Sequence, residues 1–301
     1  MKRQIVFSDL DGTLVHYQHH FKDFGQVVDT SDPVTQKAWI REVSSGLVRE
    51  CIALPSLTSG TGFISCRTID LVQDLRKQRV LFCIVTGARS STFFKRKPFL
   101  PESDFAVFEN GGIILHHEKV DLKWWERFLD VHPDVISKYE AQPPPESRRG
   151  ILWDVFRDLA SKGWEVDARD YWTAFRVSVS EKNLEEWALL TTEFGSMGLN
   201  SAFNLGKADV FPAASGKANA ARYLMELESI KIDDSVALFD DDNDIELGHL
   251  CGRSILPGIT HPKVKEILEG DMKERWSLTK ARGVFGAEEA LDRLLHSFKD
   301  E

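Results

Sequence analysis

Short apolar runs bounded by turn residues recur in the first and last thirds of the chain. The runs are rich in Val, Ile and Phe. Their length suits buried strands better than buried helices, which need ten or more residues. The expected strands are residues 4–10, 79–87, 105–112, 234–240 and 253–258.

Helical periodicity falls between these runs. Residues 67–78 place Ile69, Leu71, Val72 and Leu75 on one face. Further helices are expected within residues 215–229, 261–270 and 286–298. Strands that alternate with helices predict an α/β fold with a doubly wound, Rossmann-like parallel sheet.

The middle of the chain has a different pattern. Residues 113–207 hold most of the tryptophans, and a strand expected at 174–180 precedes a helix-like segment. This pattern predicts a smaller α+β domain, 113–207, inserted into a core formed by 1–112 and 208–301. Its tryptophans fit either a packed domain core or a binding surface.

Residues 15–65 separate the first expected strand from the first clear helix. Loops longer than about 12–15 residues are uncommon in compact domains. This stretch is therefore expected to hold structure of its own or to form a functional flap, and the sequence leaves the choice open.

The charge balance argues against nucleic acid as a partner. The formal net charge is −9, so no excess of basic side chains is available to displace counterions from phosphates. The four cysteines show no CxxC spacing, which favours a reduced, cytoplasmic location. No stretch approaches the roughly 18 apolar residues of a membrane span, and no secretory signal is evident.

The first strand ends in the sequence DLDGT. Asp9 and Asp11 can share one side of the chain, since alternate residues of a strand point the same way. Ligands of doubly wound folds bind at the carboxyl ends of the strands. Two carboxylates there suit a metal, or a nucleophile with an acid–base partner. The structural alternative is a strand that ends in an Asp-Gly turn.

Two weaker signals suit an anion. Thr86, followed by Gly87, ends the second expected strand and could donate to a phosphate oxygen. Ser215 is an expected N-cap, which places Lys217 in the first turn of the following helix. A cation at a helix N-terminus is unfavourable by itself, because that end of the helix dipole is positive. The placement makes sense if Lys217 and the free N–H groups together bind an anion. The structural alternatives are a strand-to-helix cap and a solvated lysine.

The run DDDND, residues 240–244, places four carboxylates after an apolar strand. Such a cluster is costly unless a cation neutralises it. A hard divalent ion does so, and Mg²⁺ is usual where phosphate is a co-ligand. Capping of the following helix would explain one or two of these acids, but not all of them together with Asp9 and Asp11.

Four features in this order resemble the haloacid dehalogenase superfamily of phosphohydrolases. They are the DLDGT motif, the strand that ends in Thr86, Lys217 at a helix start, and the acidic run 240–244. The resemblance covers residues 1–112 and about 208–301, and its first and last motifs are specific. The insertion after ENGG, residues 109–112, is similar to the type IIB cap subclass. Residues 215–224 and 283–295 are most similar to sucrose-phosphate phosphatases.

The resemblance implies a role for each matching residue. Asp9 is the nucleophile that forms an aspartyl-phosphate, and Asp11 is the acid and base. The residues implied to bind phosphate are Thr86, Gly87, Lys217 and Asn243, and Asn110 borders the substrate. The implied Mg²⁺ ligands are Asp9, Asp11 through its carbonyl, Asp240, and Asp244 at least indirectly.

The chain departs from the family pattern at four places. Phe239 and Asp241 replace the two glycines of the usual acidic motif, and the second motif reads TGAR where many members have TGR, which leaves the role of Arg89 open. The segment SILPGITHP, residues 254–262, lacks the usual small-residue pattern after the fifth strand. Residues 15–65 are also longer than a minimal family flap.

The expected function is a Mg²⁺-dependent phosphatase that acts on a small phosphorylated metabolite, such as a sugar phosphate, as a monomer without nucleic acid or membrane. Two alternatives stay open: a phosphomutase of the same superfamily, and a non-enzymatic sugar-phosphate-binding protein. The sequence does not identify the substrate.

Overall fold

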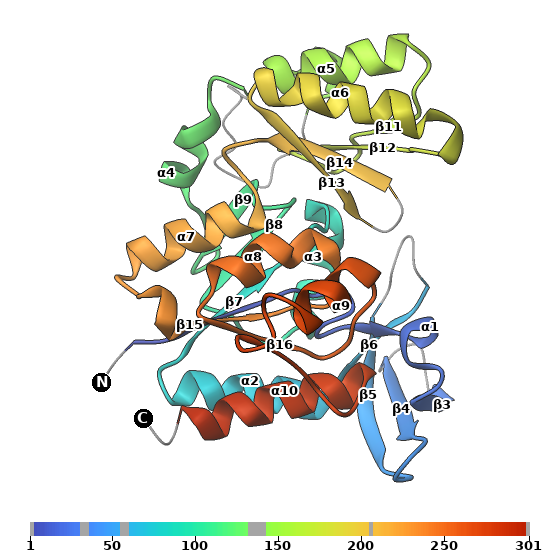
Figure 1. Ribbon diagram of the computed structural model, residues 1–301, viewed down its shortest axis with the longest axis vertical. Helices are drawn as coiled ribbons and strands as arrows, with labels where there is room; N and C mark the ends of the chain where they lie inside the picture. Colours follow the sequence, from blue (N-terminus) through green and yellow to red (C-terminus); the bar gives the residue numbers. More distant parts are fainter. Residues whose placement is uncertain (1–2, 31–35, 55–59, 132–142, 205–206, 299–301) are drawn as a thin grey trace. The chain divides into compact units, whose positions relative to one another are not determined.

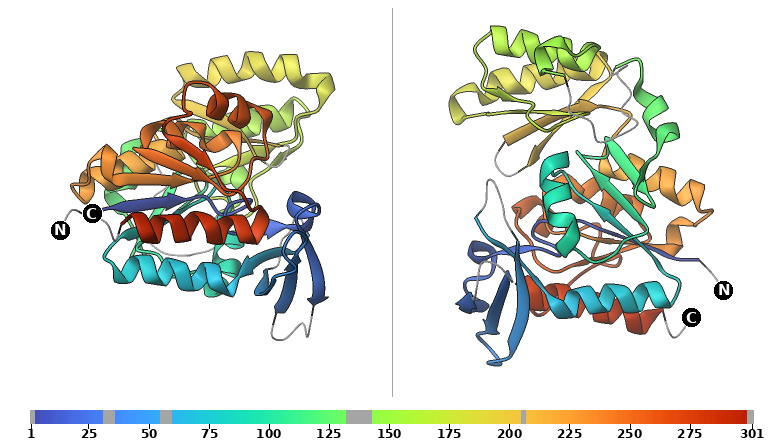
Figure 2. Two further views of the ribbon diagram at one scale, coloured as in Figure 1. Left: turned by 60° about the horizontal axis from the view of Figure 1, so that its bottom comes forward. Right: turned by 180° about the vertical axis from the view of Figure 1, so that it is seen from behind.

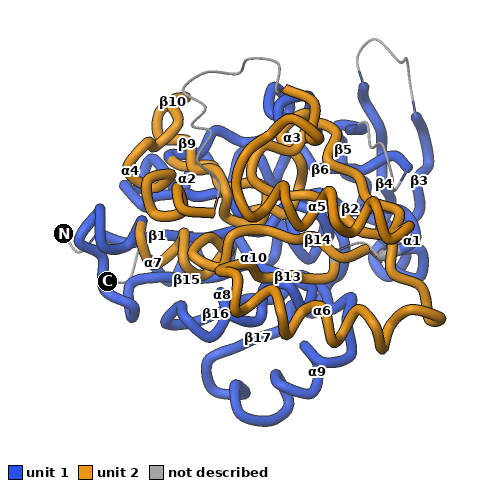
Figure 3. Tube along the Cα trace, turned by 90° about the horizontal axis from the view of Figure 1, so that it is seen from above, with its two compact units in different colours: residues 1–85, 92–104, 224–301 blue, residues 86–91, 105–223 orange. Residues whose placement is uncertain are grey.

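The computed structural model describes residues 3–30, 36–54, 60–131, 143–204 and 207–298. The chain forms two compact units, which Figure 3 distinguishes by colour. Unit 1 contains residues 1–85, 92–104 and 224–301, and unit 2 contains residues 86–91 and 105–223. Among the described residues, no helix is long and apolar enough to cross a membrane.

A parallel sheet forms the centre of unit 1. Its strands, in spatial order, are β7 (Leu81–Val85), β1 (Ile5–Ser8), β15 (Ser235–Leu238), β16 (Arg253–Leu256) and β17 (Trp276–Leu278). Strands β1, β7, β15 and β16 lie within predicted runs and are almost wholly buried, as their continuous apolar sequences require. The predicted α/β fold with a parallel sheet is confirmed.

Helices cover this sheet. Helix α2 (Cys66–Lys77) has Ser65 as its N-cap, whose hydroxyl accepts a hydrogen bond from the Thr68 N–H at 2.9 Å. It lies beside α10 (Gly283–Ser297) in Figure 1. The other helices of unit 1 are α1 (Gln18–Phe21), α8 (Ile245–Leu250) and α9 (Pro262–Glu269), with 3-10 turns η1 (Lys97–Phe99), η5 (Ile232–Asp234) and η6 (Asp242–Asp244). Helix α3 (Ser90–Arg96) has residues in both units.

The long segment after β1 holds structure of its own. It forms an antiparallel sheet in the order β2 (His16–Tyr17), β6 (Gly62–Ser65), β5 (Val48–Leu54), β4 (Lys37–Glu42) and β3 (Gly25–Thr30). We call it the inserted sheet. Its apolar side packs Ile40 and Phe63 against Phe285 at the start of α10, and Figure 2 shows it beside that end of the helix. Arg49 of β5 also pairs with Glu288 of α10 at 2.8 Å.

Unit 2 contains two sets of antiparallel strands. One has the order β10 (Lys119–Val120), β9 (Ile113–His116) and β8 (Phe105–Phe108), and the other has β11 (Val166–Asp167), β12 (Phe175–Val177), β14 (Lys207–Pro212) and β13 (Leu199–Asn204). Helices α5 (Ile151–Ser161) and α6 (Leu184–Ser196) lie side by side on the four-stranded sheet in Figure 1. The unit also contains α4 (Leu122–Trp125), η2 (Glu126–Phe128), η3 (Pro145–Ser147) and η4 (Glu181–Asn183), and α7 (Lys217–Leu227) has residues in both units.

The tryptophans of unit 2 are core residues. All are at most 9% exposed: Trp124, Trp125, Trp153, Trp164, Trp172 and Trp187. Trp187 packs edge-on against Phe194, and Trp124 donates its indole N–H to the Gly111 carbonyl at 2.8 Å. The tryptophan-rich composition of this segment therefore reflects packing, which was one of the two interpretations left open by the sequence.

Unit 2 extends beyond residues 113–207. It also holds 105–112 and 208–223, which the sequence-based division places with the core. Glu109 gives a physical reason, because its fully buried carboxylate accepts hydrogen bonds from the backbone N–H groups of Trp172 at 2.9 Å and Thr173 at 2.7 Å. These bonds join the end of β8 to the segment before β12.

Candidate active site

Two adjacent strands of unit 1 carry the predicted carboxylates. β1 and β15 pair in parallel, and the Asp9 N–H donates to the Leu238 carbonyl at 2.8 Å. Asp9 and Asp240 therefore follow neighbouring strand ends, although they are more than 200 residues apart. Asp9 is 5% exposed and Asp240 is 1% exposed. We call Asp9, Asp11, Asp240 and Asp244 the acidic cluster.

Two hydroxyls hold the Asp240 carboxylate. Thr13 donates to Oδ1 at 2.8 Å and Thr260 donates to Oδ2 at 2.9 Å. Burial raises the pKa of Asp240 to about 7, and the charge of Asp241 adds to this effect while the two hydroxyls oppose it. A buried carboxylate of this kind is stabilised by a nearby cation.

Gly12 allows the first loop to approach Asp240. Its φ is +91°, and a Cβ at this position would lie 2.1 Å from the Asp240 Oδ2. Both the left-handed backbone and the lack of space exclude a side chain here. The turn predicted after Asp11 therefore does more than reverse the chain, because it brings the loop against the second acid.

Asp11 is held by two side chains that sequence reasoning missed. Its Oδ1 accepts hydrogen bonds from the Tyr17 hydroxyl at 2.5 Å and from the Arg96 Nη1 at 2.6 Å. Tyr17 lies on β2 of the inserted sheet and Arg96 ends α3. Both are 1% exposed.

The other polar residues of the run 241–244 have different surroundings. Asp241 accepts a hydrogen bond from the Asp242 N–H at 2.8 Å and so caps η6, which turns this extra charge toward the backbone. Asp244 is fully buried. The side-chain oxygen of Asn243 is buried and accepts no hydrogen bond from the described residues, so it could accept one from a bound ligand.

Phe239, which replaces a family glycine, is accommodated by its neighbours. Its ring is fully buried and meets Trp276 edge-on, with centroids 5.0 Å apart. Gly248 of α8 makes room for it, because a Cβ there would lie 2.6 Å from the Phe239 ring. The departure is therefore absorbed by packing behind the acidic cluster.

Unit 2 brings together the other predicted residues. The Asn110 N–H donates to the Thr86 carbonyl at 3.3 Å, and the Asn110 carbonyl accepts from the Gly216 N–H at 2.9 Å. Lys217 begins α7 and is 5% exposed. Gly87 is buried, and the Thr86 hydroxyl accepts from the Ala88 N–H at 3.1 Å while keeping its own proton to donate.

One detail of this region differs from expectation. Ser215 is not the N-cap of α7, since the helix starts at Lys217 and the Ser215 hydroxyl donates to the Pro212 carbonyl at 2.7 Å. The Asn110 side chain is 2% exposed and donates to the Asp209 carboxylate at 3.0 Å, and its position beside the substrate stays a prediction.

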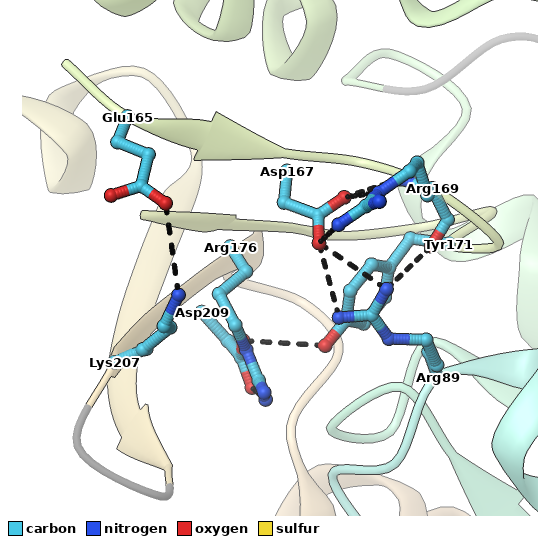
Figure 4. Close-up of polar contacts among 8 residues, drawn as sticks. All are labelled: Arg89, Glu165, Asp167, Arg169, Tyr171, Arg176, Lys207 and Asp209. Carbon is cyan, nitrogen blue, oxygen red and sulfur yellow. Dashed lines mark hydrogen bonds and ion pairs between the residues drawn. The ribbon is translucent and has the colours of Figure 1, made fainter. Parts of the chain in front are cut away.

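A polar network surrounds Asp209. Arg176 binds both of its oxygens, at 2.6 and 2.9 Å, and the Tyr171 hydroxyl lies 3.5 Å from Oδ1. Figure 4 shows the neighbouring Arg89 turned toward the carboxylate of Asp167, at 3.3 Å. Arg89, whose role the TGAR motif left uncertain, also lies over the Tyr171 ring at 4.8 Å.

The acidic cluster fits magnesium by its chemistry. Within the described ranges, no group of three or more His, Cys, Asp or Glu side chains is arranged to hold a metal ion by itself. Mg²⁺ keeps several waters and commonly takes only one or two carboxylates. The buried carboxylates of Asp9 and Asp240, with the Asp11 carbonyl, are hard oxygen donors of the required kind.

Four residues of this region carried no usable signal in the sequence. Thr13 belongs to the DLDGT motif, where its hydroxyl had no evident partner. Thr260, Tyr17 and Arg96 lie 20, 6 and 85 residues from the acids they bind. Only the folded chain brings these side chains to Asp240 and Asp11.

Solved structures with this architecture are known. A Synechocystis sucrose-phosphatase in complex with sucrose and phosphate aligns with TM-score 0.64 and 15% identity, over 99% of both chains. A phosphatase of the haloalkanoate (HAD) enzyme superfamily from Bacteroides thetaiotaomicron aligns with TM-score 0.54 and 14% identity, over 99% of this chain and 96% of that one. A haloacid dehalogenase-like hydrolase from the same organism gives TM-score 0.56 and 14% identity, over 97% and 100%.

These similarities confirm, at the level of the fold, the resemblance that the motifs indicate. They extend over nearly the whole chain, so they include the inserted segments as well as the parallel sheet. A scan against protein-family models found no match, and a comparison with curated protein sequences found none either.

Proposed function

We propose that this chain, which has the haloacid dehalogenase fold, is a Mg²⁺-dependent phosphatase that hydrolyses a small phosphorylated metabolite through an aspartyl-phosphate. The observation that carries the proposal is the placement of Asp9 and Asp240 at neighbouring strand ends, both buried. Two buried carboxylates at neighbouring strand ends are hard oxygen donors of the kind that binds a divalent cation. A site that binds a metal ion and a phosphoryl group accounts for both buried acids.

The proposed reaction has two steps. An Asp9 carboxylate oxygen attacks phosphorus, the bond from phosphorus to the leaving oxygen breaks, and that oxygen takes a proton from Asp11. A water then attacks the aspartyl-phosphate, its proton passes to Asp11, and the Asp9–phosphorus bond breaks to release phosphate. The covalent route divides one high barrier into two lower ones. Asp11 returns to its starting protonation state after each cycle.

Magnesium would be held by the carboxylates of Asp9 and Asp240 and the carbonyl of Asp11, with Asp244 acting through water. When bound, the ion neutralises charge on the phosphoryl group. Thr13 and Thr260 fix the orientation of Asp240 by hydrogen bonds to its two oxygens. Removing a residue that hydrogen-bonds to a metal ligand commonly weakens metal binding about 10- to 100-fold.

Thr86, Gly87, Lys217 and Asn243 are proposed to bind the phosphoryl oxygens. The support is chemical: Lys217 supplies a positive charge at the first residue of α7, and Thr86 keeps a hydroxyl proton to donate. Asn243 would contribute as a donor, through its side-chain amide N–H groups. Transferring phosphoryl groups are stabilised mainly by such preorganised donors and cations.

A sugar phosphate is the proposed class of substrate. The support is the resemblance to sucrose-phosphate phosphatases, together with the solvent-accessible polar side chains of Asp167 and Arg169 in unit 2. Polar side chains of this kind suit the hydroxyls of a sugar. Stacking of a sugar on the tryptophans of unit 2 is not part of the proposal, because those rings are buried.

The test is phosphate release from a panel of sugar phosphates, phosphoglycerates and an aryl phosphate, measured with Mg²⁺ and with EDTA. Wild type is compared with Asp9→Asn. We expect release that needs Mg²⁺ and is lost in the variant. Release that persists in Asp9→Asn would refute the covalent route. Tight binding of a sugar phosphate without release would favour the binding-protein alternative, and a requirement for a bisphosphate would favour the mutase.

The free state of the four cysteines is consistent with the reduced, cytoplasmic location that we propose. We also propose a monomer. Light scattering coupled to gel filtration would test it, and a mass near twice the 34.2 kDa of the chain would contradict it.

A further inference from the structure

Three side chains of unit 1 form a closed hydrogen-bonded triangle. Arg96 donates through Nη1 to the Asp11 Oδ1 at 2.6 Å and through Nη2 to the Tyr17 hydroxyl oxygen at 2.7 Å. The Tyr17 hydroxyl donates to the same Asp11 Oδ1 at 2.5 Å. The three residues come from the loop after β1, from β2 and from α3.

Two members of the triangle are buried. Tyr17 and Arg96 are each 1% exposed, whereas the Asp11 side chain is 19% exposed. Burial, together with the charge of Asp11, raises the pKa of Tyr17, so its hydroxyl remains a donor. Burying a guanidinium is costly unless it is paired and hydrogen-bonded, and Asp11 provides that pairing.

The two oxygens of Asp11 have different surroundings. Both donors bind Oδ1, and Oδ2 accepts no hydrogen bond from the described residues. The backbone is held as well, because Asp11 forms a bridge with Val15 and the Gly12 N–H donates to the Val15 carbonyl at 2.7 Å. One oxygen is thus anchored while the other can exchange a proton.

The inserted sheet supplies one of the anchors. Tyr17 lies on β2, which pairs with β6 through Tyr17 and Gly62. Its ring stacks on His19 with centroids 5.8 Å apart. A Cβ at Gly62 would lie 2.6 Å from Val15 and 3.4 Å from the Tyr17 ring, so this strand packs closely against the loop that carries Asp11.

We propose that Tyr17 and Arg96 are positioning residues that anchor Oδ1 of Asp11 and leave Oδ2 as the atom that exchanges the proton. The inserted sheet is then part of the catalytic apparatus and not a peripheral addition. This inference rests on the proposed function, in which Asp11 is the acid and base.

The leaving group decides how much the anchoring matters. A sugar or other alkyl alcohol is a poor leaving group, so its oxygen needs the proton from Asp11 as the bond to phosphorus breaks. A nitrophenolate leaves without that proton. Disturbing the position of Oδ2 therefore slows attack on alkyl phosphates more than attack on aryl phosphates. The parameter kcat/KM reports this first step.

The experiment compares Tyr17→Phe and Arg96→Lys with wild type. Lysine keeps the charge but cannot bond Asp11 and Tyr17 together as the planar guanidinium does. Tyr223→Phe is the matched control, because it removes a hydroxyl that donates to Asp121 at 2.8 Å in unit 2. The substrates are p-nitrophenyl phosphate and the sugar phosphate that the wild type hydrolyses best.

We expect kcat/KM for the sugar phosphate to fall about tenfold or more in Tyr17→Phe and Arg96→Lys, since each loses a hydrogen bond to a charged group. We expect kcat/KM for p-nitrophenyl phosphate to fall less than about threefold, because nitrophenolate leaves without a proton from Asp11. Tyr223→Phe should leave both values unchanged. An equal loss for both substrates would assign the triangle a structural role only, and no loss for either would remove the role altogether.

A stability measurement separates failure of this inference from failure of the proposed function. Urea unfolding of Tyr17→Phe, Asp11→Asn and the double variant tests the coupling between the two side chains without any substrate. If the two variants are coupled but the wild type releases no phosphate, the hydrogen bond between Tyr17 and Asp11 exists, and both its catalytic role and the phosphatase assignment are refuted. Additive effects would show that Tyr17 does not anchor Asp11.

Discussion

Thr13 donates a hydrogen bond to Asp240 at 2.8 Å, although 227 residues separate them in the chain. Thr13 is fully buried in the loop after β1, and Asp240 follows β15. The bond links the first acidic motif to the last. It also explains why the first motif ends in a hydroxyl residue, since Gly12 brings that loop directly against the Asp240 carboxylate.

Thr13→Val should weaken the site and the fold together. Valine keeps the shape of threonine but leaves one oxygen of a buried carboxylate without a donor, which costs about 1–3 kcal/mol. Urea unfolding at neutral pH would measure this loss. The Mg²⁺ concentration for half-maximal phosphate release should rise about tenfold. Thr260→Val should destabilise less, because Thr260 is exposed and water can replace its hydroxyl.

Gly12→Ala should be far more damaging than an ordinary glycine substitution. The new Cβ would lie 2.1 Å from the Asp240 Oδ2, in addition to the strain of φ +91°. Gly46→Ala is the matched control, since Gly46 has φ +73° and nothing within 4 Å of the added Cβ. We expect the control to lose about 1–2 kcal/mol from backbone strain alone. Similar unfolding free energies for both variants would contradict the close approach.

Arg176→Met should destabilise unit 2 strongly. It leaves the fully buried Asp209 carboxylate without its charged partner, and breaking a buried pair costs about 3–5 kcal/mol. Lys162→Met breaks an exposed pair with Asp158 and should destabilise far less, because solvent screens that pair. Thermal and urea unfolding of both variants would test the difference. Comparable small losses would mean that Asp209 is solvated.

Phe239→Gly introduces the glycine that the haloacid dehalogenase motif usually has at this position, but it should destabilise this protein. The Phe239 ring fills space between Trp276 and Gly248, and removing a buried phenyl group costs about 3–5 kcal/mol. Phe239→Leu should cost less, because it keeps most of the volume. Both are measured by urea unfolding. A glycine variant as stable as wild type would show that the packing behind the acidic cluster is loose.

Acid should destabilise the wild type more steeply than Asp167→Asn. Burial acts to raise the pKa of Asp167, but hydrogen bonds from Arg169 and the charge of Arg89 outweigh it and lower that pKa. A carboxyl with a lowered pKa in the folded state adds stability above its unfolded pKa of about 3.9, and this is lost as the pH falls through the lower folded value. Unfolding midpoints between pH 6 and about 2 would show the difference. Parallel curves would argue against this ion pair.

The strands of the parallel sheet were predictable because they are buried on both faces. Continuous apolar runs such as residues 79–87 and 234–240 have no polar face, and they became β7 and β15. The same reasoning located Asp9 and Asp240 at strand ends. The inserted sheet gave no comparable signal, because its three longest strands, β3, β4 and β5, are partly exposed and their polar positions resemble loop residues.

The sequence by itself determined the fold class and the acids that the fold presents, since both depend on local patterns of burial and on motifs a few residues long. The tertiary structure decided which donors hold those acids. Tyr17 and Arg96 reach Asp11, and Thr260 reaches Asp240, across separations that no local pattern records. A hydrogen bond depends on where two side chains lie in space, and that is settled only when the strands and the inserted sheet have packed.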